Sequence, residues 1–313
     1  MQQAAPLVQA VSTSRDTVGE SPVWSVAEQA LYWVDIEGRC IHRLDWSTRV
    51  QQTWNFPERV GCIALSTRGT MIAAMETGIF EVMLQQPPAV SVTQLASVNH
   101  PQSGMRFNDG RCDRQGRFWA STMVRDMSLA SAAGAIYCLD ERGLSAPLLH
   151  GYITPNGMAF SADGSTAYVS DSHPSRQTIW KHTFDAANGT WGTPALWVDM
   201  KPLSGRPDGA AMDAEGCYWI CGNDAGLVHR FNPQGVLLQS FPLPVSKPAM
   251  CAFGGPELRH LFVTSIQPAS PAAGFDAGLD GALLVLEPNV QGLPEPLFSR
   301  FPIPFSQLVV PVR

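Results

Sequence analysis

Short apolar runs recur along the chain and predict β-strands. Each run spans about four positions and holds β-branched, aromatic or small apolar residues, a composition typical of strands. The six runs lie at 31–34, 71–74, 118–121, 167–170, 218–221 and 261–264. Most are followed by a second run, such as 134–140 or 226–231, which ends in Asp, Asn-Pro or Glu-Pro and indicates the next strand of a hairpin.

The spacing of these runs predicts the architecture. The third residues of the runs are Trp33, Ala73, Trp119, Val169, Ile220 and Val263. They are separated by about 40 to 50 residues, the length of a four-stranded propeller blade. Long helical periodicity is absent, and 27 Gly and 25 Pro supply turns. We predict an all-β, six-bladed β-propeller with four antiparallel strands per blade, formed by residues 1–313 as a single domain. Two β-sandwiches would need a linker near the middle of the chain, and none is visible.

A turn that begins with Ser, Asp or Gly precedes each run, and four of these turns follow an oxygen-bearing side chain at a fixed distance of five residues. The four residues are Glu20, Asn108, Asn156 and Asp208. Gly61 and Ala249 occupy the same position in the other two repeats. Because blades are related by rotation about one axis, residues at one phase lie at one height around the channel. We expect the four side chains to converge at one mouth, beside space left by Gly61 and Ala249.

The convergent side chains have the chemistry of a metal site. Glu20, Asn156 and Asp208 offer hard oxygen ligands with a formal charge of -2, which suits Ca, Mg or Mn. Alternatively, the Asx-Gly pairs in this set are simply turns, although that account does not explain Glu20. Arg106 lies two residues before Asn108, so strand alternation places both on one face. Its donors suit hydroxyls or a carboxylate product, although a surface arginine paired with an acid is the alternative.

Composition excludes several classes of protein. The net charge of -6, from 27 acidic and 21 basic residues, gives no basic footprint for nucleic acid or an anionic membrane. Residues 1–18 lack the features of a secretory signal, and no run reaches the roughly 18 apolar residues of a membrane helix.

The seven cysteines form an odd set without a tight Cys-x-x-Cys pair, which indicates buried free thiols. A zinc site at Cys217 and Cys221 is disfavoured because the segment alternates like a strand. We expect a cytoplasmic protein that is a monomer or weak dimer.

Several motifs match one known family in order along the chain. They are Gly-Glu-Ser-Pro-Val-Trp at 19–24, Arg-Phe-Asn-Asp-Gly at 106–110, Pro-Asn-Gly-Met-Ala at 155–159, Pro-Asp-Gly at 207–209 and Cys-Ala-Phe-Gly-Gly at 251–255. With these motifs the chain resembles the SMP-30/gluconolactonase/LRE-like proteins, which include regucalcin and bacterial sugar lactonases.

The resemblance implies one divalent metal ion near the propeller axis, which could be Ca, Zn, Mg, Mn or Fe. Residues matching Glu20, Asn156 and Asp208 would hold it, and those matching Arg106 and Asn108 would bind a sugar lactone. Asp126 stands where some relatives carry a Glu that touches substrate hydroxyls.

The implied activity is hydrolysis of a sugar-derived lactone to its aldonic acid. The metal would polarise the carbonyl and activate water, with Asp208 as the base. Two alternatives stay open: an esterase or phosphotriesterase on the same metal site, and a non-catalytic metal-binding propeller. The sequence also leaves open whether an N-terminal strand or the apolar run at 308–310 closes the ring.

Overall fold

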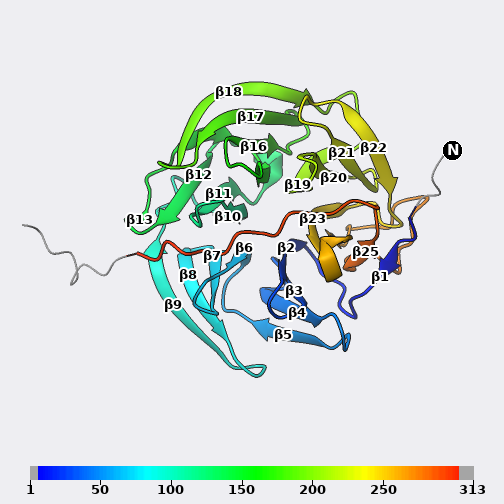
Figure 1. Cartoon of the computed structure of the whole chain (residues 1–313), viewed down its shortest axis with the longest axis horizontal. Coiled ribbons are helices and arrows are strands. Elements are labelled where there is room, and N and C mark those ends of the chain that lie inside the picture. Colours follow the sequence, from blue (N-terminus) through cyan, green and yellow to red (C-terminus); the bar gives the residue numbers. More distant parts are fainter. Residues whose placement is uncertain (1–5, 303–313) are drawn as a thin grey trace, which may run out of the picture.

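The computed structural model describes residues 6–302, which form six antiparallel sheets arranged as blades around one axis (Figure 1). The described chain is nearly all-β, and its helical content is limited to two 3₁₀ turns, η1 (Met127–Leu129) and η2 (Pro256–Leu258). This confirms the predicted six-bladed propeller. Neither of these turns is long and apolar enough to cross a membrane, and the described residues contain no other helix.

Each blade is built from the axis outward in chain order. The innermost strands are β2 (Gly19–Ser25), β6 (Val60–Leu65), β10 (Met105–Cys112), β15 (Pro155–Phe160), β19 (Arg206–Met212) and β23 (Pro248–Gly254). The second strands are β3 (Ala30–Asp35), β7 (Met71–Met75), β11 (Phe118–Val124), β16 (Thr166–Asp171), β20 (Tyr218–Asn223) and β24 (His260–Ser265). All six apolar runs noted in the sequence fall in these second strands, which are buried on both faces.

The outer half of each blade is less buried. The third strands are β4 (Cys40–Asp45), β8 (Gly78–Leu84), β12 (Gly134–Asp140), β17 (Thr178–Asp185), β21 (Leu227–Phe231) and β25 (Leu284–Leu286). The outermost strands are β5 (Gln51–Asn55), β9 (Val90–Ser97), β13 (Gly143–Leu144) with β14 (Leu149–Tyr152), β18 (Thr190–Asp199), β22 (Leu237–Pro242) and β1 (Gln9–Ala10). Both β13 and β14 pair with β12, so the outer edge of the third blade is split.

The N-terminal strand closes the ring. Gln9 and Ala10 of β1 pair with Val285 and Leu284 of β25, so the last blade contains the first strand of the chain. The alternative closing run at 308–310 lies outside the described residues. Closure therefore joins the two ends of the sequence within one sheet.

Buried tryptophans and thiols fill the spaces between blades. Trp33, Trp119 and Trp219 are fully buried, and each donates its indole N–H to a buried carboxylate. All seven cysteines are buried and free, as the sequence predicted. The apolar interior thus contains a few polar groups, most of which are paired by specific hydrogen bonds.

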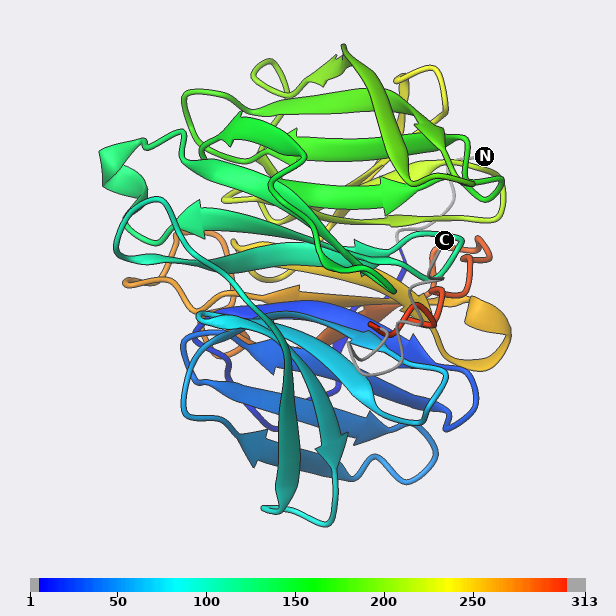
Figure 2. The ribbon, with the colours of Figure 1, turned by 90° about the vertical axis from the view of Figure 1, so that its left-hand side faces the viewer.

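A C-terminal strap, residues 290–302, crosses the middle of the ring (red in Figure 1). Its backbone joins the blades at their turns: Ala214 N donates to Gln291 O at 2.8 Å, and Phe298 N donates to Leu65 O at 2.8 Å. Figure 2 shows the strap on one face of the ring and η1 projecting from the opposite face. The channel therefore has a strapped mouth and an open mouth.

Candidate active site and metal-binding residues

The phased residues lie near the starts of the innermost strands, at a β-bulge in every blade. Glu20 and Asn156 are the last paired residues before a register shift in β2 and β15. Asn108 and Asp208 lie inside such a shift in β10 and β19. The same shifts occur around Gly61 in β6 and within β23. A bulge re-aims the side chains beside it, and the strap contacts the opposite ends of the innermost strands, at Leu65 and Met212.

The glycines that follow the site residues serve close packing rather than hairpin turns. The Asx-Gly pairs lie within β10, β15 and β19, so the alternative that they are turns is wrong. Gly157 has φ +58°, and a Cβ there would lie 2.5 Å from Tyr218 Oη. A Cβ on Gly61 would lie 2.3 Å from Phe107 O. The space beside Gly61 is therefore filled by the backbone of β10 and is not left open for a substrate.

Arg106 and Asn108 form a hydrogen-bonded pair that reaches Asn156. Arg106 Nη1 donates to Asn108 Oδ1 at 2.6 Å and to Phe107 O at 2.9 Å. Asn108 Nδ2 donates to Asn156 Oδ1 at 3.1 Å and to Pro155 O at 2.9 Å. Arg106 is only 9% exposed, so it is not the paired surface arginine of the alternative interpretation. Its buried Nε has no acceptor within the described part of the chain.

Glu20 and Asp208 are buried carboxylates that are poorly compensated. Burial raises the pKa of Glu20 well above its usual value, and the charges of Asp208 and Asp109 raise it further. Burial also raises the pKa of Asp208 to about 7, although Arg206 and Asn223 act in the opposite direction. Two buried carboxyl groups that repel each other raise the free energy of the folded protein when both are ionised. A bound cation would relieve that cost.

The donor set fits a divalent cation with a preference for oxygen. Glu20 and Asp208 supply two carboxylates, and Asn156 supplies one amide oxygen, all at least nine-tenths buried. Within residues 6–302, no group of three His, Cys, Asp or Glu side chains could hold a metal ion. The candidate set therefore depends on the amide as its third ligand. Hard oxygen donors of this kind suit Ca, Mg or Mn.

Residues 18–267 match the family described as the SMP-30/gluconolactonase/LRE-like region. The chain belongs to this family. The chain is similar to the 6-deoxy-6-sulfogluconolactonase of Pseudomonas putida, to which it is 37% identical over 286 residues that cover 90% of this chain and 95% of the relative. The pentonolactonase of Haloferax volcanii is 30% identical over 283 residues, which cover 89% of this chain and 93% of the relative. A solved structure of a calcium-binding protein, regucalcin, from Agrobacterium tumefaciens superposes with a TM-score of 0.83 at 26% identity, covering 94% of this chain and 97% of the other.

Asp126 shares no hydrogen bond with Arg106 or Asn108 within the described residues. It is exposed at the start of η1, and its Oδ1 accepts from Ser128 N at 3.0 Å and from Ser128 Oγ at 2.6 Å. It borders a cavity of about 330 Å³ together with Arg125. The carboxylate thus caps η1 at the open mouth, and a role toward substrate stays a prediction.

Other loop residues at the open mouth support the backbone. Asp171 accepts from the backbone N–H groups of Ile153 and Thr154 at 2.9 and 3.0 Å. His173 Nε2 lies 3.2 Å from Met127 O, so it links its loop to η1. Of these two residues, only His173 contacts η1 in this way.

Sequence reasoning missed two residues that hold the candidate ligands. Ser21 N donates to Glu20 Oε2 at 3.0 Å, and Ser21 Oγ accepts from Ile63 N at 2.9 Å. Ser21 adopts φ +47°, a strained conformation for a non-glycine residue. Asn223, at the end of β20, donates from Nδ2 to Asp208 Oδ2 at 2.6 Å. Ser21 lies next to Glu20 in a recognised motif, whereas Asn223 carried no signal that distinguished it from a turn residue.

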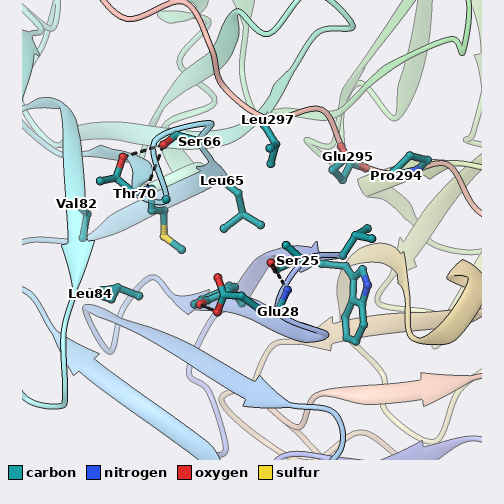
Figure 3. A pocket seen from close by; sticks show the side chains of 16 residues that line it. Ser25, Glu28, Leu65, Ser66, Thr70, Val82, Leu84, Pro294, Glu295 and Leu297 are labelled. Atoms are coloured by element: carbon teal, nitrogen blue, oxygen red, sulfur yellow. Dashed lines mark hydrogen bonds between the residues drawn. The ribbon is translucent and has the colours of Figure 1, made fainter.

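A separate large cavity lies on the strapped side between the first two blades (Figure 3). It has a volume of about 640 Å³, and none of the candidate site residues lines it. Its wall includes Leu65, Val82 and, from the strap, Leu297. The carboxylate of Glu28 already accepts from Tyr32 Oη at 2.7 Å. This cavity is largely apolar and none of the candidate ligands reaches it, so it is not the candidate site.

Proposed function

We propose that this protein is a metal-dependent lactonase that opens a sugar-derived lactone to its aldonic acid. The observations that support the proposal are the mutual repulsion of the buried Glu20 and Asp208 carboxylates and the hydrogen bonds that link Arg106, Asn108 and Asn156. Relatives at 37% and 30% identity that span nearly the whole chain are named as lactonases of sugar acids. A small-molecule substrate also suits a site built from side chains inside a narrow channel.

Glu20, Asn156 and Asp208 would hold the divalent cation. When bound, such an ion supplies Lewis acidity for a carbonyl oxygen and lowers the pKa of a water molecule. The residues favour Ca, Mg or Mn over metals that prefer thiolates. We propose one such ion for each chain.

Arg106 and Asn108 would orient the lactone. Arg106 has a buried Nε without an acceptor in the described chain, so a lactone oxygen or hydroxyl would satisfy it. Asn108 holds both Arg106 and Asn156 through hydrogen bonds of 2.6 and 3.1 Å. A substrate bound to Arg106 would therefore lie beside the proposed metal ligands.

Asp208 would act as the base. A water molecule attacks the carbonyl carbon, and the Asp208 carboxylate accepts its proton. The ring C–O bond then breaks, and the proton goes to the departing alkoxide to give the hydroxy acid. Lactones hydrolyse appreciably without a catalyst, so the required reduction of the barrier is modest by enzyme standards.

The test is acid release from a panel of lactones after chelation and readdition of single metals. Gluconolactone, xylonolactone, arabinolactone and galactonolactone serve as substrates, and titration of the released acid is the measurement. We expect metal-dependent release by the unmodified protein, and none above background from Asp208→Ala or Glu20→Ala. Retained activity in either variant would contradict the proposal.

A further inference from the structure

A row of polar side chains connects Asp208 with the charged surface of its blade. Asn223 Nδ2 donates to Asp208 Oδ2 at 2.6 Å, and Arg206 Nη2 donates to Asn223 Oδ1 at 3.4 Å. Arg206 Nε in turn donates to Asp224 Oδ2 at 2.6 Å. Asn223 is only 1% exposed. Its amide group thus lies between a buried carboxylate and a guanidinium that is held at the surface.

The neighbours of Asn223 fix the orientation of its amide. An ionised carboxylate only accepts hydrogen bonds and a guanidinium only donates them, so Nδ2 must face Asp208 and Oδ1 must face Arg206. Arg206 is also anchored through Nη1 to Ser172 O at 3.0 Å. The position of Asp208 Oδ2 is therefore set by groups outside the channel, while Oδ1 is left to the site.

The aspartates that end β3 and β16 lie one position earlier in their blades, where β20 has Gly222, and they make different contacts. Asp35 ends β3 and accepts from the backbone N–H groups of Thr17 and Val18 at 2.9 and 3.0 Å. Asp171 ends β16 and accepts from two backbone N–H groups in the same way. An Asp at the end of β20 would face Asp208 and repel it. Asn223 instead donates to a side chain of the site.

We propose that Asn223 is a positioning residue of the metal site, which holds the Asp208 carboxylate so that Oδ1 is presented to the cation, and that Arg206 holds the Asn223 amide. This inference rests on the proposed function, because it takes Asp208 as a metal ligand. Outer partners that orient a ligand typically contribute about 10- to 100-fold to metal affinity. Asn223 should therefore act on metal affinity more than on substrate binding.

The test compares Asn223→Leu with the unmodified full chain, using Mn²⁺ as the probe. Leu has a similar size, no donor and no charge, so the substitution changes no net charge. We expect the Mn²⁺ dissociation constant, measured by calorimetry after chelation, to rise about 10- to 100-fold. At saturating Mn²⁺ the KM for gluconolactone should stay within about twofold. A dissociation constant within about twofold of that of the unmodified chain would overturn the inference.

Asn188→Leu is the matched control. Asn188 Nδ2 donates to Asp185 Oδ2 at 2.7 Å, which is the same amide to carboxylate contact on an exposed turn. Its loss should leave Mn²⁺ affinity unchanged.

Arg206→Met keeps the inference testable if Asn223→Leu does not fold. Removal of a positive charge near a cation site would by itself tighten Mn²⁺ binding. Release of the Asn223 amide would weaken it. A weaker affinity in Arg206→Met therefore supports the positioning role, whereas an equal or tighter affinity contradicts it.

The outcome for the unmodified chain separates this inference from the proposed function. If the unmodified chain binds no Mn²⁺ and opens no lactone, the proposed function fails and the role of Asn223 fails with it. If it binds Mn²⁺ and opens lactones while Asn223→Leu matches it in both, only the role of Asn223 is wrong.

Discussion

Asp208 and Asp213 belong to the same blade, five residues apart, yet their surroundings differ sharply. Both are buried, at 5% and 0% exposure. Asp213 Oδ1 accepts from two backbone N–H groups at 2.9 and 2.8 Å, and Oδ2 accepts from Trp219 Nε1 and Arg230 Nε, both at 2.8 Å. Among the described residues, Asn223 is the one hydrogen-bond donor to Asp208.

The difference shows that the carboxylates at the two ends of the channel have different roles. A buried carboxylate with its acceptor sites filled contributes to structure, because both oxygens are satisfied and its charge is paired. A buried carboxylate that lacks donors and faces another carboxylate raises the free energy of the metal-free protein. Its oxygens are available to a ligand. Asp113 repeats the satisfied pattern, with Trp119 Nε1 at 3.0 Å and Arg117 Nη1 at 2.9 Å. The turns on the strapped side thus stabilise the fold, and the bulges at the open mouth carry the candidate site.

The largest expected effect is the loss of activity on changing Asp208 to Asn. The substitution preserves shape but removes the charge and the base, so kcat/KM for gluconolactone should fall more than about a hundredfold, beyond the range typical of outer partners. Asp213→Asn, assayed below its unfolding temperature, should stay within about threefold of the unmodified protein. Equal losses in the two variants would show that the distinction between them is false.

The second effect is on the free energy of unfolding. Here Asp213→Asn should cause the larger loss and Asp208→Asn the smaller. Asp213→Asn removes the buried one of the two carboxylates that pair with Arg230 and leaves only the exposed Glu215, so the free energy of unfolding should fall by about 3 to 5 kcal/mol. Asp208→Asn removes a poorly compensated buried charge and should leave the stability of the metal-free protein unchanged or higher. Urea unfolding in the presence of a chelator measures both. A comparable loss for Asp208→Asn would mean that its carboxylate is also structural.

The features that repeat in every blade could be predicted from the sequence. Each blade repeats the same apolar run and turn, so the strands, the blade number and the phase of Glu20 and Asp208 followed from spacing. Asp126 was a different case. Its capping of η1 depends on Ser128, and an Asp followed two residues later by Ser is a local capping signal that sequence reasoning could have used.

The remaining features depend on strand register, which spacing does not determine. A bulge inserts residues opposite a partner strand, so the residue facing Asp208 cannot be counted from the turns. Asn223 lies 15 residues further along the chain from Asp208, and only the pairing of β19 with β20 brings them together. The closing strand β1 is two exposed residues, Gln9 and Ala10, too short for any apolar pattern.

A third buried carboxylate, Asp16, extends the comparison to pH. Asp16 Oδ2 accepts from Trp33 Nε1 at 2.7 Å, as in the structural sites, but its cationic partner is His42, with Nε2 at 3.2 Å from Oδ1. Burial alone would lower the pKa of His42, but hydrogen bonds to Asp16 and Cys40 raise it to about 9.

Because the folded pKa of His42 lies above the ordinary value of 6.5, its contribution to stability is complete below about pH 6.5 and is lost as the pH rises through about 9. The full shift corresponds to at most about 3.4 kcal/mol. Unfolding at pH 6 and pH 9.5 should show this loss in the unmodified protein and not in His42→Gln. His150→Gln, on the exposed part of β14, should behave like the unmodified protein. A loss of equal size in His42→Gln would assign the pH dependence to another group.

The smallest expected effect is the stabilisation of the folded protein by a bound cation, which should require Asp208 but not Asp213. A ligand that binds only the folded state stabilises it by about 2.7 kcal/mol at 100 times its dissociation constant. Mn²⁺ at that excess should raise the free energy of unfolding of the unmodified protein and of Asp213→Asn by this amount, although the second starts from a lower value. Asp208→Asn should gain almost nothing at the same concentration. If Asp213→Asn also lost the gain, the strapped end would be coupled to the metal site through the inner strand, and the two ends could no longer be treated as separate.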